Sequence, residues 1–294
     1  MKQRWKTSAA MSQKTSATSD MTRLSLAIST CPNDTFIFDA LVNGQIPSRG
    51  LEFETRFADI GDLNRLASDG IPDVVKVSYA HLPALLDTYV ALTAGGALGF
   101  GCGPLLVAKD KSDFERISSP DIAVPGLNTT ANFLLNRYFP TIEKKTVLLF
   151  SGIVDAVSAG NFDAGLIIHE SRFTFRDKGL QEVADLGNLW HQETGLPIPL
   201  GCIVARRNLP QKLLLSINTL IAESVAYAFA HPDASEAFVG RHAMELSPDV
   251  IRQHIHLYVN DFSLDLKPLG KKAVRTLLKE KLSPESHIFV DDPV

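Results

Sequence analysis

The sequence lacks the features that several large classes of protein require. It has only three cysteines, Cys31, Cys102 and Cys202, none in CxxC spacing, which argues against a disulfide framework and a thiolate zinc site. A net charge of −4 without basic clusters argues against nucleic acid as a partner. No apolar run suggests a membrane span, and residues 1–20 are polar, unlike a secretory signal. We therefore expect a cytoplasmic protein with a disordered tail over residues 1–20.

What the sequence does contain is a regular alternation of strand and helix patterns. Leu24–Thr30 is a short apolar run typical of a buried strand, and Asp34 is suited to cap the helix that follows. Leu51–Phe57 alternates apolar and polar residues, Asp59–Ala67 is helical in pattern, and Asp73–Val77 is a third strand. Because this order requires crossover connections, it predicts a mostly parallel sheet with ligands at the carboxyl ends of its strands.

The same alternation starts again at Asp121, after a glycine-rich passage. The apolar strand Leu196–Arg207 is well placed to lead back to the first sheet, and four helical stretches complete the chain. A chain that leaves one α/β lobe, builds a second and returns needs two crossing segments, which form a hinge. We predict a first lobe over residues 21–108 and 203–294 and a second over residues 109–202.

The start of the second lobe contains a candidate anion site. Residues Asn128, Thr129, Thr130 and Ala131 lie between a short strand and a helix. A helix N-terminus offers unpaired N–H groups and partial positive charge, which suit a carboxylate. A plain N-cap at Asn128 or Thr129, without any ligand, would give the same pattern. Both interpretations stay open at this point.

A second candidate contact lies at the end of the third strand of the first lobe. Lys76, Val77 and Ser78 end that strand and should face the same cleft, where Lys76 brings a positive charge. The alternatives are that Lys76 extends to solvent and that Ser78 only caps a helix beginning near Tyr79. Ser29 lies at the equivalent end of the first strand and has the same two interpretations.

His169 is the most distinctive single residue. It follows the apolar run Leu166–Ile168, where a buried strand should emerge into a cleft. Imidazole can accept and return a proton near neutral pH, so a base there is chemically suitable. Glu170 is adjacent and could orient the imidazole, but neighbouring strand residues point to opposite faces, so an orienting role is not assumed. A lone histidine is more often structural, and only its location distinguishes His169.

Other candidates are weaker. His254 and His256 have i, i+2 spacing, which does not place them on one helix face, so we predict no metal pair there. His191, in an expected loop, would line the cleft mouth or the surface. Gly99–Gly103 is followed by a strand instead of a helix, which favours close packing or a bend over a nucleotide loop. Cys31 has no identifiable partner base and is expected to be structural or cleft-lining.

Four ordered motifs give the chain a resemblance to a known family. After Met21 the chain is similar along nearly its whole length to the 1,4-dihydroxy-6-naphthoate synthase family of menaquinone biosynthesis. The motifs are STCPNDTFIFDAL at Ser29–Leu41, KVSYAHLP at Lys76–Pro83, NTTANFLL at Asn128–Leu135 and GLIIHESRFTF at Gly165–Phe175.

The resemblance implies a fold of two α/β lobes like that of periplasmic binding proteins, with the ligand cleft between them. It also implies that His169 is the catalytic base of the reaction. The substrate contacts that it implies fall on Lys76, Val77, Ser78, Thr129, Thr130 and Ala131.

The implied reaction converts cyclic dehypoxanthine futalosine to 1,4-dihydroxy-6-naphthoate by base-initiated C–C cleavage. Such an enzyme would be a carbon–carbon lyase that acts on a small carboxylated substrate and uses no cofactor or metal. The alternatives are the chorismate dehydratase of the same pathway and a non-catalytic protein that binds small anions. Apolar residues on the C-terminal helices fit a homodimer and fit core packing equally well.

Overall fold

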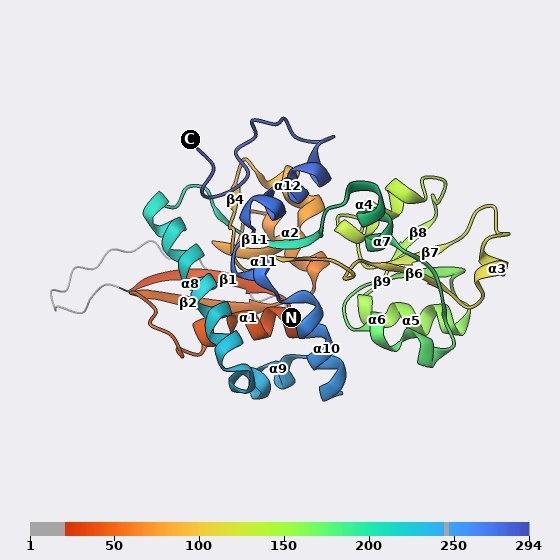
Figure 1. Cartoon of the computed structure of the whole chain (residues 1–294), viewed down its shortest axis with the longest axis horizontal. Helices are drawn as coiled ribbons and strands as arrows, with labels where there is room; N and C mark the ends of the chain where they lie inside the picture. The colour runs from red at the N-terminus through yellow and green to blue at the C-terminus, as the bar shows by residue number, and fades with distance from the viewer. Residues whose placement is uncertain (1–20, 244–246, 294) are drawn as a thin grey trace.

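The computed structural model describes residues 21–243 and 247–293, so the predicted tail over residues 1–20 lies outside the described residues. The elements form two α/β lobes side by side along the long axis (Figure 1). The first lobe contains β1 (Thr22–Ile28), α1 (Pro32–Val42), β2 (Leu51–Phe57), α2 (Ile60–Ser68), β3 (Val74–Ser78), the 3₁₀ helix η1 (Tyr79–Leu85), β4 (Tyr89–Ala91), β5 (Ala97–Gly99), β11 (Ile198–Arg206), α8 (Gln211–Ala230), η3 (Pro232–Ser235), α9 (Glu236–His242), α10 (Pro248–Tyr258), α11 (Asp261–Leu264) and α12 (Lys267–Leu278).

The second lobe is the yellow-to-green part of the chain (Figure 1). It contains β6 (Leu105–Ala108), α3 (Lys111–Phe114), β7 (Ile122–Val124), α4 (Thr130–Tyr138), β8 (Lys145–Val147), α5 (Phe150–Ala159), β9 (Ala164–Ile167), α6 (Ser171–Thr174), η2 (Phe175–Lys178), β10 (Gln181–Asp185) and α7 (Leu186–Thr194).

Each lobe is built on one mixed sheet, in which parallel pairs lie beside antiparallel ones, and not on the mostly parallel sheet that was predicted. In the first sheet the order is β2-β1-β3-β11-β4, with β5 beside β11, and β1 runs parallel to both β2 and β3. In the second the order is β10-β6-β9-β7-β8, and β7 runs parallel to β8 and β9. The strands β6, β10 and β11 run antiparallel to their neighbours. The predicted βαβ crossovers and the two-lobed α/β fold are therefore confirmed.

The two strand patterns that the sequence distinguishes occupy different places in the first sheet. Every residue of β3 is buried, because β3 lies between β1 and β11 and is covered on both faces. In the edge strand β2, buried or half-buried residues alternate with exposed ones. Lys76, the middle residue of β3, is consequently buried, so its charge needs a partner inside the protein.

Two short segments cross between the lobes, residues 100–104 and residues 195–197. They run together, since β5 pairs with β11 through Gly99 and Ile198. The predicted lobe boundaries differ from this arrangement: β6 lies in the second sheet although it was assigned to the first lobe, and β11 joins the first sheet from Ile198 on instead of from residue 203. An apolar strand has the same composition in either sheet, so composition alone does not locate the crossing.

The glycines of the outgoing crossing permit close packing, as expected. Gly103 lies against Gly187 at the start of α7, and a Cβ on Gly103 would lie 2.2 Å from the Gly187 Cα. Gly101 has a φ of 67°, which most other residues avoid. The passage Gly99–Gly103 therefore serves the turn between the lobes.

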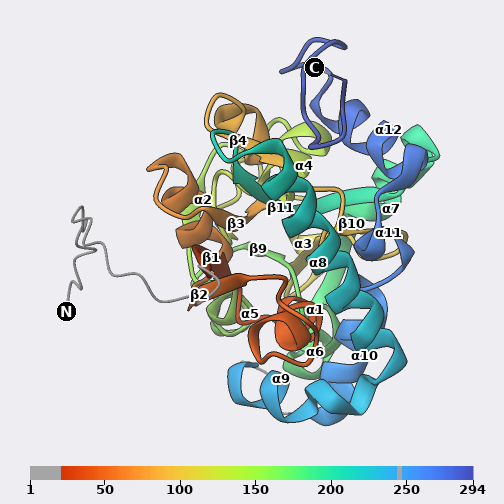
Figure 2. The ribbon, with the colours of Figure 1, turned by 90° about the vertical axis from the view of Figure 1, so that its left-hand side faces the viewer.

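Helix α8 departs from the expectation that no segment is suited to span a membrane. It is 20 residues long, and its mean hydropathy of 1.5 meets the length and composition of a membrane span. In the fold it lies along the face nearest the viewer in Figure 2, packed against α1, and Ser224 Oγ donates to Ile37 O at 2.6 Å. Its buried residues recur at helical spacing, as in a core helix. They are Leu214, Ile217, Leu220, Ile221, Ser224, Val225 and Ala228.

Several local predictions need correction. Helix α1 begins at Pro32 with Cys31 as its N-cap residue, so Asp34 does not cap it but lies buried in its first turn. The helix expected near Tyr79 is a 3₁₀ helix with Pro83 inside it. His191 lies in α7 and not in a loop. The short strands β4, β5 and β10 were not predicted because three to five residues carry too little periodicity.

Candidate active site

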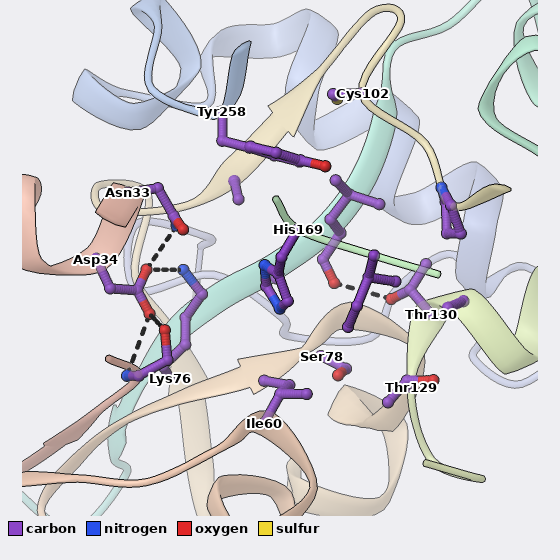
Figure 3. Close-up of a pocket in the computed structure, with 17 residues that line it drawn as sticks. Asn33, Asp34, Ile60, Lys76, Ser78, Cys102, Thr129, Thr130, His169 and Tyr258 are labelled. Carbon is purple, nitrogen blue, oxygen red and sulfur yellow. Dashed lines mark hydrogen bonds and ion pairs between the residues drawn. The ribbon is translucent and has the colours of Figure 1, made fainter. Parts of the chain in front are cut away.

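A pocket lies between the carboxyl edges of the two sheets, next to the crossing segments (Figure 3). Both lobes contribute to it. The first lobe supplies Ser29, Asn33, Asp34, Ile60, Lys76, Ser78, Ala97 and Tyr258, the second supplies Thr129, Thr130, Ala131, Ile168 and His169, and the crossing segments and β11 supply Cys102, Pro104, Leu200 and Gly201.

The first-lobe wall is a buried ion pair inside a hydrogen-bond network. Lys76 Nζ lies 2.5 Å from Asp34 Oδ1, and the exposed fractions of the two side chains are 6% and 1%. The Asp34 carboxylate also accepts from Ser29 Oγ at 2.7 Å and from Asn33 Nδ2 at 2.8 Å. Figure 3 shows this network on one side of the pocket. Asp34 is thus saturated with donors, whereas the Lys76 ammonium keeps two further N–H groups for a ligand.

The position of Lys76 depends on the missing side chain of Gly201 on the neighbouring strand β11. A Cβ at position 201 would lie 2.9 Å from Lys76 Cε and 3.1 Å from the Val77 carbonyl oxygen. The lysine stem therefore passes over Gly201 to reach Asp34. Gly201 was not singled out from the sequence, because only the pairing of β3 with β11 brings it beside Lys76.

Ser78 is held by a residue that the sequence did not single out. Asn64 on α2 accepts from the Ser78 amide at 2.9 Å and donates to Ser78 Oγ at 3.1 Å. The Ser78 hydroxyl still has its own proton to donate. It therefore faces the pocket as an oriented donor, and it does not cap η1, for which no side-chain cap bond is formed.

The second-lobe wall is the N-terminus of α4. Thr129 is its N-cap residue: Thr129 Oγ1 accepts from the Asn132 amide at 3.2 Å and donates to Gly126 O at 2.7 Å. Thr130 Oγ1 accepts from the Ala80 amide and donates to Leu200 O, at 3.2 and 2.9 Å. Both hydroxyls are thus engaged within the protein. The donors left for a ligand are the main-chain N–H groups of the first turn, which have no carbonyl partner within the helix.

His169 lies between these two walls (Figure 3). It directly follows β9 and Ile168, and its φ of 56° places it in the left-handed region, which non-glycine residues rarely occupy. Such a conformation typically costs about 1 kcal/mol or more, and it occurs most often at functional sites. Here it turns the imidazole out of the strand direction and into the pocket.

The surroundings of His169 keep its imidazole neutral. Burial lowers the pKa of His169 to about 4; Asp34 opposes this shift and Lys76 adds to it. Aromatic rings surround it, with the centroid of Phe150 at 5.0 Å and that of Tyr258 at 6.4 Å. A neutral imidazole has a free lone pair, so His169 is in the protonation state that a base needs.

His254 lies behind His169. From the sequence we predicted only that it forms no metal pair with His256, and no other role was assigned to it. It is fully buried on α10, and its ring stacks on that of His169 at a centroid distance of 5.8 Å and an interplanar angle of 19°. Its Nε2 lies 2.9 Å from Asn33 Oδ1, and its Nδ1 lies 3.7 Å from Glu170 Oε2. Burial, with His169 and Lys76, lowers the pKa of His254 well below its usual value.

The three thiols are not placed for nucleophilic chemistry. All are buried and unbonded to one another. Burial raises the pKa of Cys102, which lines the pocket, to about 12, and that of Cys202 to the same value. Burial also raises the pKa of Cys31 far above its ordinary value. Thiols in such surroundings stay protonated at neutral pH and are inert.

The structure brings most of the predicted site residues into one pocket. Lys76, Ser78, Thr129, Thr130, Ala131 and His169 all line it. Val77 is the exception: its side chain is fully buried in the core, as expected for the alternate residue of a strand. His191 packs edge-on against Phe100 at 5.1 Å and does not line this pocket.

Across the described residues 21–243 and 247–293, no cluster of three or more histidine, cysteine or carboxylate side chains is arranged to hold a metal ion. The pocket is lined by the Lys76–Asp34 ion pair, the Asn33 amide, the neutral imidazole of His169 and the amides at the start of α4. Five hydroxyl groups also line it, those of Ser29, Ser78, Thr129, Thr130 and Tyr258. These groups can bind an anionic oxygen and accept a proton.

This combination of fold and site defines the class: a two-lobed α/β protein like the periplasmic binding proteins, with a pocket between its lobes that is lined by a lysine, a helix N-terminus and a histidine. Solved structures agree. A protein of Archaeoglobus fulgidus is 32% identical with a TM-score of 0.82, covering 87% of this chain and 96% of its own. The aliphatic sulphonate binding protein SsuA of Escherichia coli shares only the fold, at 14% identity and a TM-score of 0.61 over 92% of both chains.

The particular family follows from comparison of sequences. The profile of the menaquinone biosynthesis family matches residues 24–281, and the chain belongs to that family. It is 46% identical to the 1,4-dihydroxy-6-naphtoate synthase of Thermus thermophilus, over 88% of this chain and 94% of that enzyme. The enzyme of the same name from Streptomyces coelicolor is 44% identical over 87% and 91%. The resemblance inferred from the four motifs is confirmed, and the family's members include synthases.

Proposed function

We propose that this protein is a 1,4-dihydroxy-6-naphthoate synthase that acts on cyclic dehypoxanthine futalosine. The observation that carries the proposal is the placement of a neutral, left-handed His169 between a lysine-bearing wall and a helix N-terminus, in a chain 46% identical to a synthase of that name. A solute-binding protein with the same fold would need the anion contacts but would have no use for a neutral base in a strained conformation.

The substrate carboxylate is proposed to lie at the N-terminus of α4. The amides of Thr130 and Ala131 are in its first turn, where N–H groups and the helix dipole together favour an anion. The hydroxyls of Thr129 and Thr130 would act indirectly, by fixing the turn and tying it to Ala80 and Leu200. This refines the predicted roles of the two threonines, since their hydroxyl groups are already engaged.

The other wall is proposed to bind the oxygen-rich part of the substrate. Lys76 Nζ and the hydroxyl groups of Ser78 and Tyr258 are donors on that wall, and an ammonium can stabilise negative charge that develops on an oxygen during C–C cleavage. His169 would remove a hydroxyl or carbon-bound proton to start the cleavage. Aromatisation of the naphthoate that remains after the ribose-derived ring has left would supply much of the driving force for this lyase reaction.

We also propose that the enzyme works in the cytoplasm, where a small biosynthetic intermediate would be its partner.

The test is turnover of cyclic dehypoxanthine futalosine by the purified protein and by His169→Ala, with chorismate as a comparison substrate. We expect product from the first substrate only, and a loss of kcat of about 10²-fold or more in the variant with its fold intact, since general-base catalysis contributes on that order. Turnover of chorismate alone, or of neither substrate, would contradict the assignment.

A further inference from the structure

His254 connects parts of the pocket that belong to different lobes. Its helix, α10, packs on α1 and β5 of the first lobe. Its Nε2 bonds to Asn33 Oδ1, also in the first lobe, while its ring stacks on His169 and its Nδ1 faces Glu170, both of which follow β9 in the second lobe. Contacts from one buried side chain to both lobes exist only while the lobes are held together as they are here.

The hydrogen bonds fix the orientation of the His254 ring. Asn33 Nδ2 donates to Asp34 Oδ1, so the other end of that amide, Oδ1, is an acceptor. His254 Nε2 must therefore carry the proton in this bond. Because the side chain has no exposed surface, the ring cannot turn without breaking the bond inside the protein.

The same bond continues to the ion pair. From His254 the chain of contacts runs through Asn33 to Asp34 and then to Lys76, with heavy-atom distances of 2.9, 2.8 and 2.5 Å. The His254 ring also stacks on the ring of His169, at a centroid distance of 5.8 Å. One residue thus contacts the base and, through Asn33, the ion pair on the opposite wall.

We propose that His254 is the positioning residue of this site, which holds the His169 ring by stacking and orients the Asp34–Lys76 pair through Asn33. This inference rests on the proposed function, because it takes His169 as the base. His254 itself lies behind His169, does not line the pocket and touches no substrate. Its effect on the reaction is therefore indirect, through the geometry of the two walls.

Two variants separate the two contacts. His254→Gln keeps an amide donor for Asn33 and removes the ring, whereas His254→Phe keeps the ring and removes the donor. With the first variant we expect kcat to fall about tenfold or more while KM stays within about twofold, because displacing a base by a fraction of an ångström is enough for such losses. With the second we expect mainly a rise in KM, because the Lys76 wall loses its support.

A measurement without substrate makes the test independent of the proposed function. The ring protons of His169 are titrated by NMR in the free protein and in both variants. We expect His254→Gln to raise the pKa of His169 from about 4 towards its ordinary value, because an amide and water replace the ring face that desolvates it, and His254→Phe to leave it near 4. The other titratable groups that face the two rings are unchanged in both variants: Cys31 and Asp34 at the start of α1, Lys76 on β3, Cys102 in the crossing segment, Glu170 after β9 and Tyr258 on α10.

The outcomes are distinguishable. If the two variants differ in the titration but the unaltered protein does not turn over the substrate, the proposed function is refuted, and only the contact by which His254 holds the His169 ring is retained. Turnover by the unaltered protein with identical titrations, kcat and KM in both variants would refute the positioning role. Equal losses of kcat in both variants, with unchanged titrations, would reduce His254 to a packing residue. Circular dichroism checks the fold, and should His254→Phe not fold, the titration of His254→Gln decides alone.

Discussion

The two walls of the pocket are built from different chemical groups. The first-lobe wall carries formal charges, but Lys76 and Asp34 neutralise each other before any ligand arrives. The second lobe contributes no charged side chain to the pocket, only the amides of α4 and the neutral His169. No acidic residue lies in the first turn of α4 to offset the partial positive charge of its N-terminus. We therefore expect a ligand carboxylate to bind at the second wall, although only the first wall contains a positively charged side chain.

The largest effect is expected from breaking the charged wall. Asp34→Asn leaves a buried ammonium without its counter-ion, which should lower the free energy of unfolding by about 3–5 kcal/mol. Adding Lys76→Met removes the unpaired buried ammonium, so the double variant should regain most of the free energy of unfolding that Asp34→Asn loses. Denaturant unfolding of the two single variants and the double variant measures the coupling.

A loss in the double variant equal to the sum of the single losses would contradict the expected coupling. In that case Lys76 and Asp34 would stabilise the fold separately, and the first wall could not be treated as a neutral pair.

The neutral state of His169 should make the free energy of unfolding depend on pH. The unfolded chain binds a proton on His169 below its ordinary pKa of 6.5, whereas the folded protein does not until about pH 4. The contribution of His169 to the free energy of unfolding is therefore fully present above pH 6.5. It is lost as the pH falls from 6.5 to about 4, by at most about 1.4 kcal/mol per pH unit for each such histidine. The lowered pKa of His254 acts in the same direction.

Chemical denaturation at a series of pH values measures this slope. We expect it to decrease in His169→Asn and again when His254→Gln is added. His256→Gln, an exposed residue on the same helix, checks that removing any histidine from α10 does not alter it. An unchanged slope in the double variant would show that the two rings are not kept neutral by burial.

A third prediction concerns the contact between Gly201 and Lys76. In Gly201→Ala the added methyl group would lie 2.9 Å from Lys76 Cε, so the lysine has to move. We expect KM to rise several-fold, with a loss of about 1–3 kcal/mol in the free energy of unfolding, because overpacking in a buried site is of that size. Gly152→Ala, in α5 where a Cβ meets nothing within 4 Å, is the matched control.

The sequence predicts the residues of the second wall better than the contacts of the first. The NTTA motif identified the α4 N-terminus because a cap is a local pattern, and the apolar run before His169 identified the end of β9. The partnership of Asp34 with Lys76 was missed because the two residues are 42 positions apart, and Asp34 was interpreted as a local cap. His254 was missed for the same reason: its partners, Asn33 and Glu170, are distant in sequence.

The smallest effect is expected at the cap of the second wall. Thr129→Ala removes the oxygen that accepts from the Asn132 amide, which should lower the free energy of unfolding by about 1 kcal/mol. If the first turn of α4 binds the substrate carboxylate, KM should rise while kcat changes little, because the base is untouched. Thr129→Ser keeps the oxygen and should behave like the unaltered protein. A fall in kcat at constant KM in Thr129→Ala would instead move the carboxylate to the Lys76 wall and reverse the comparison of the two walls.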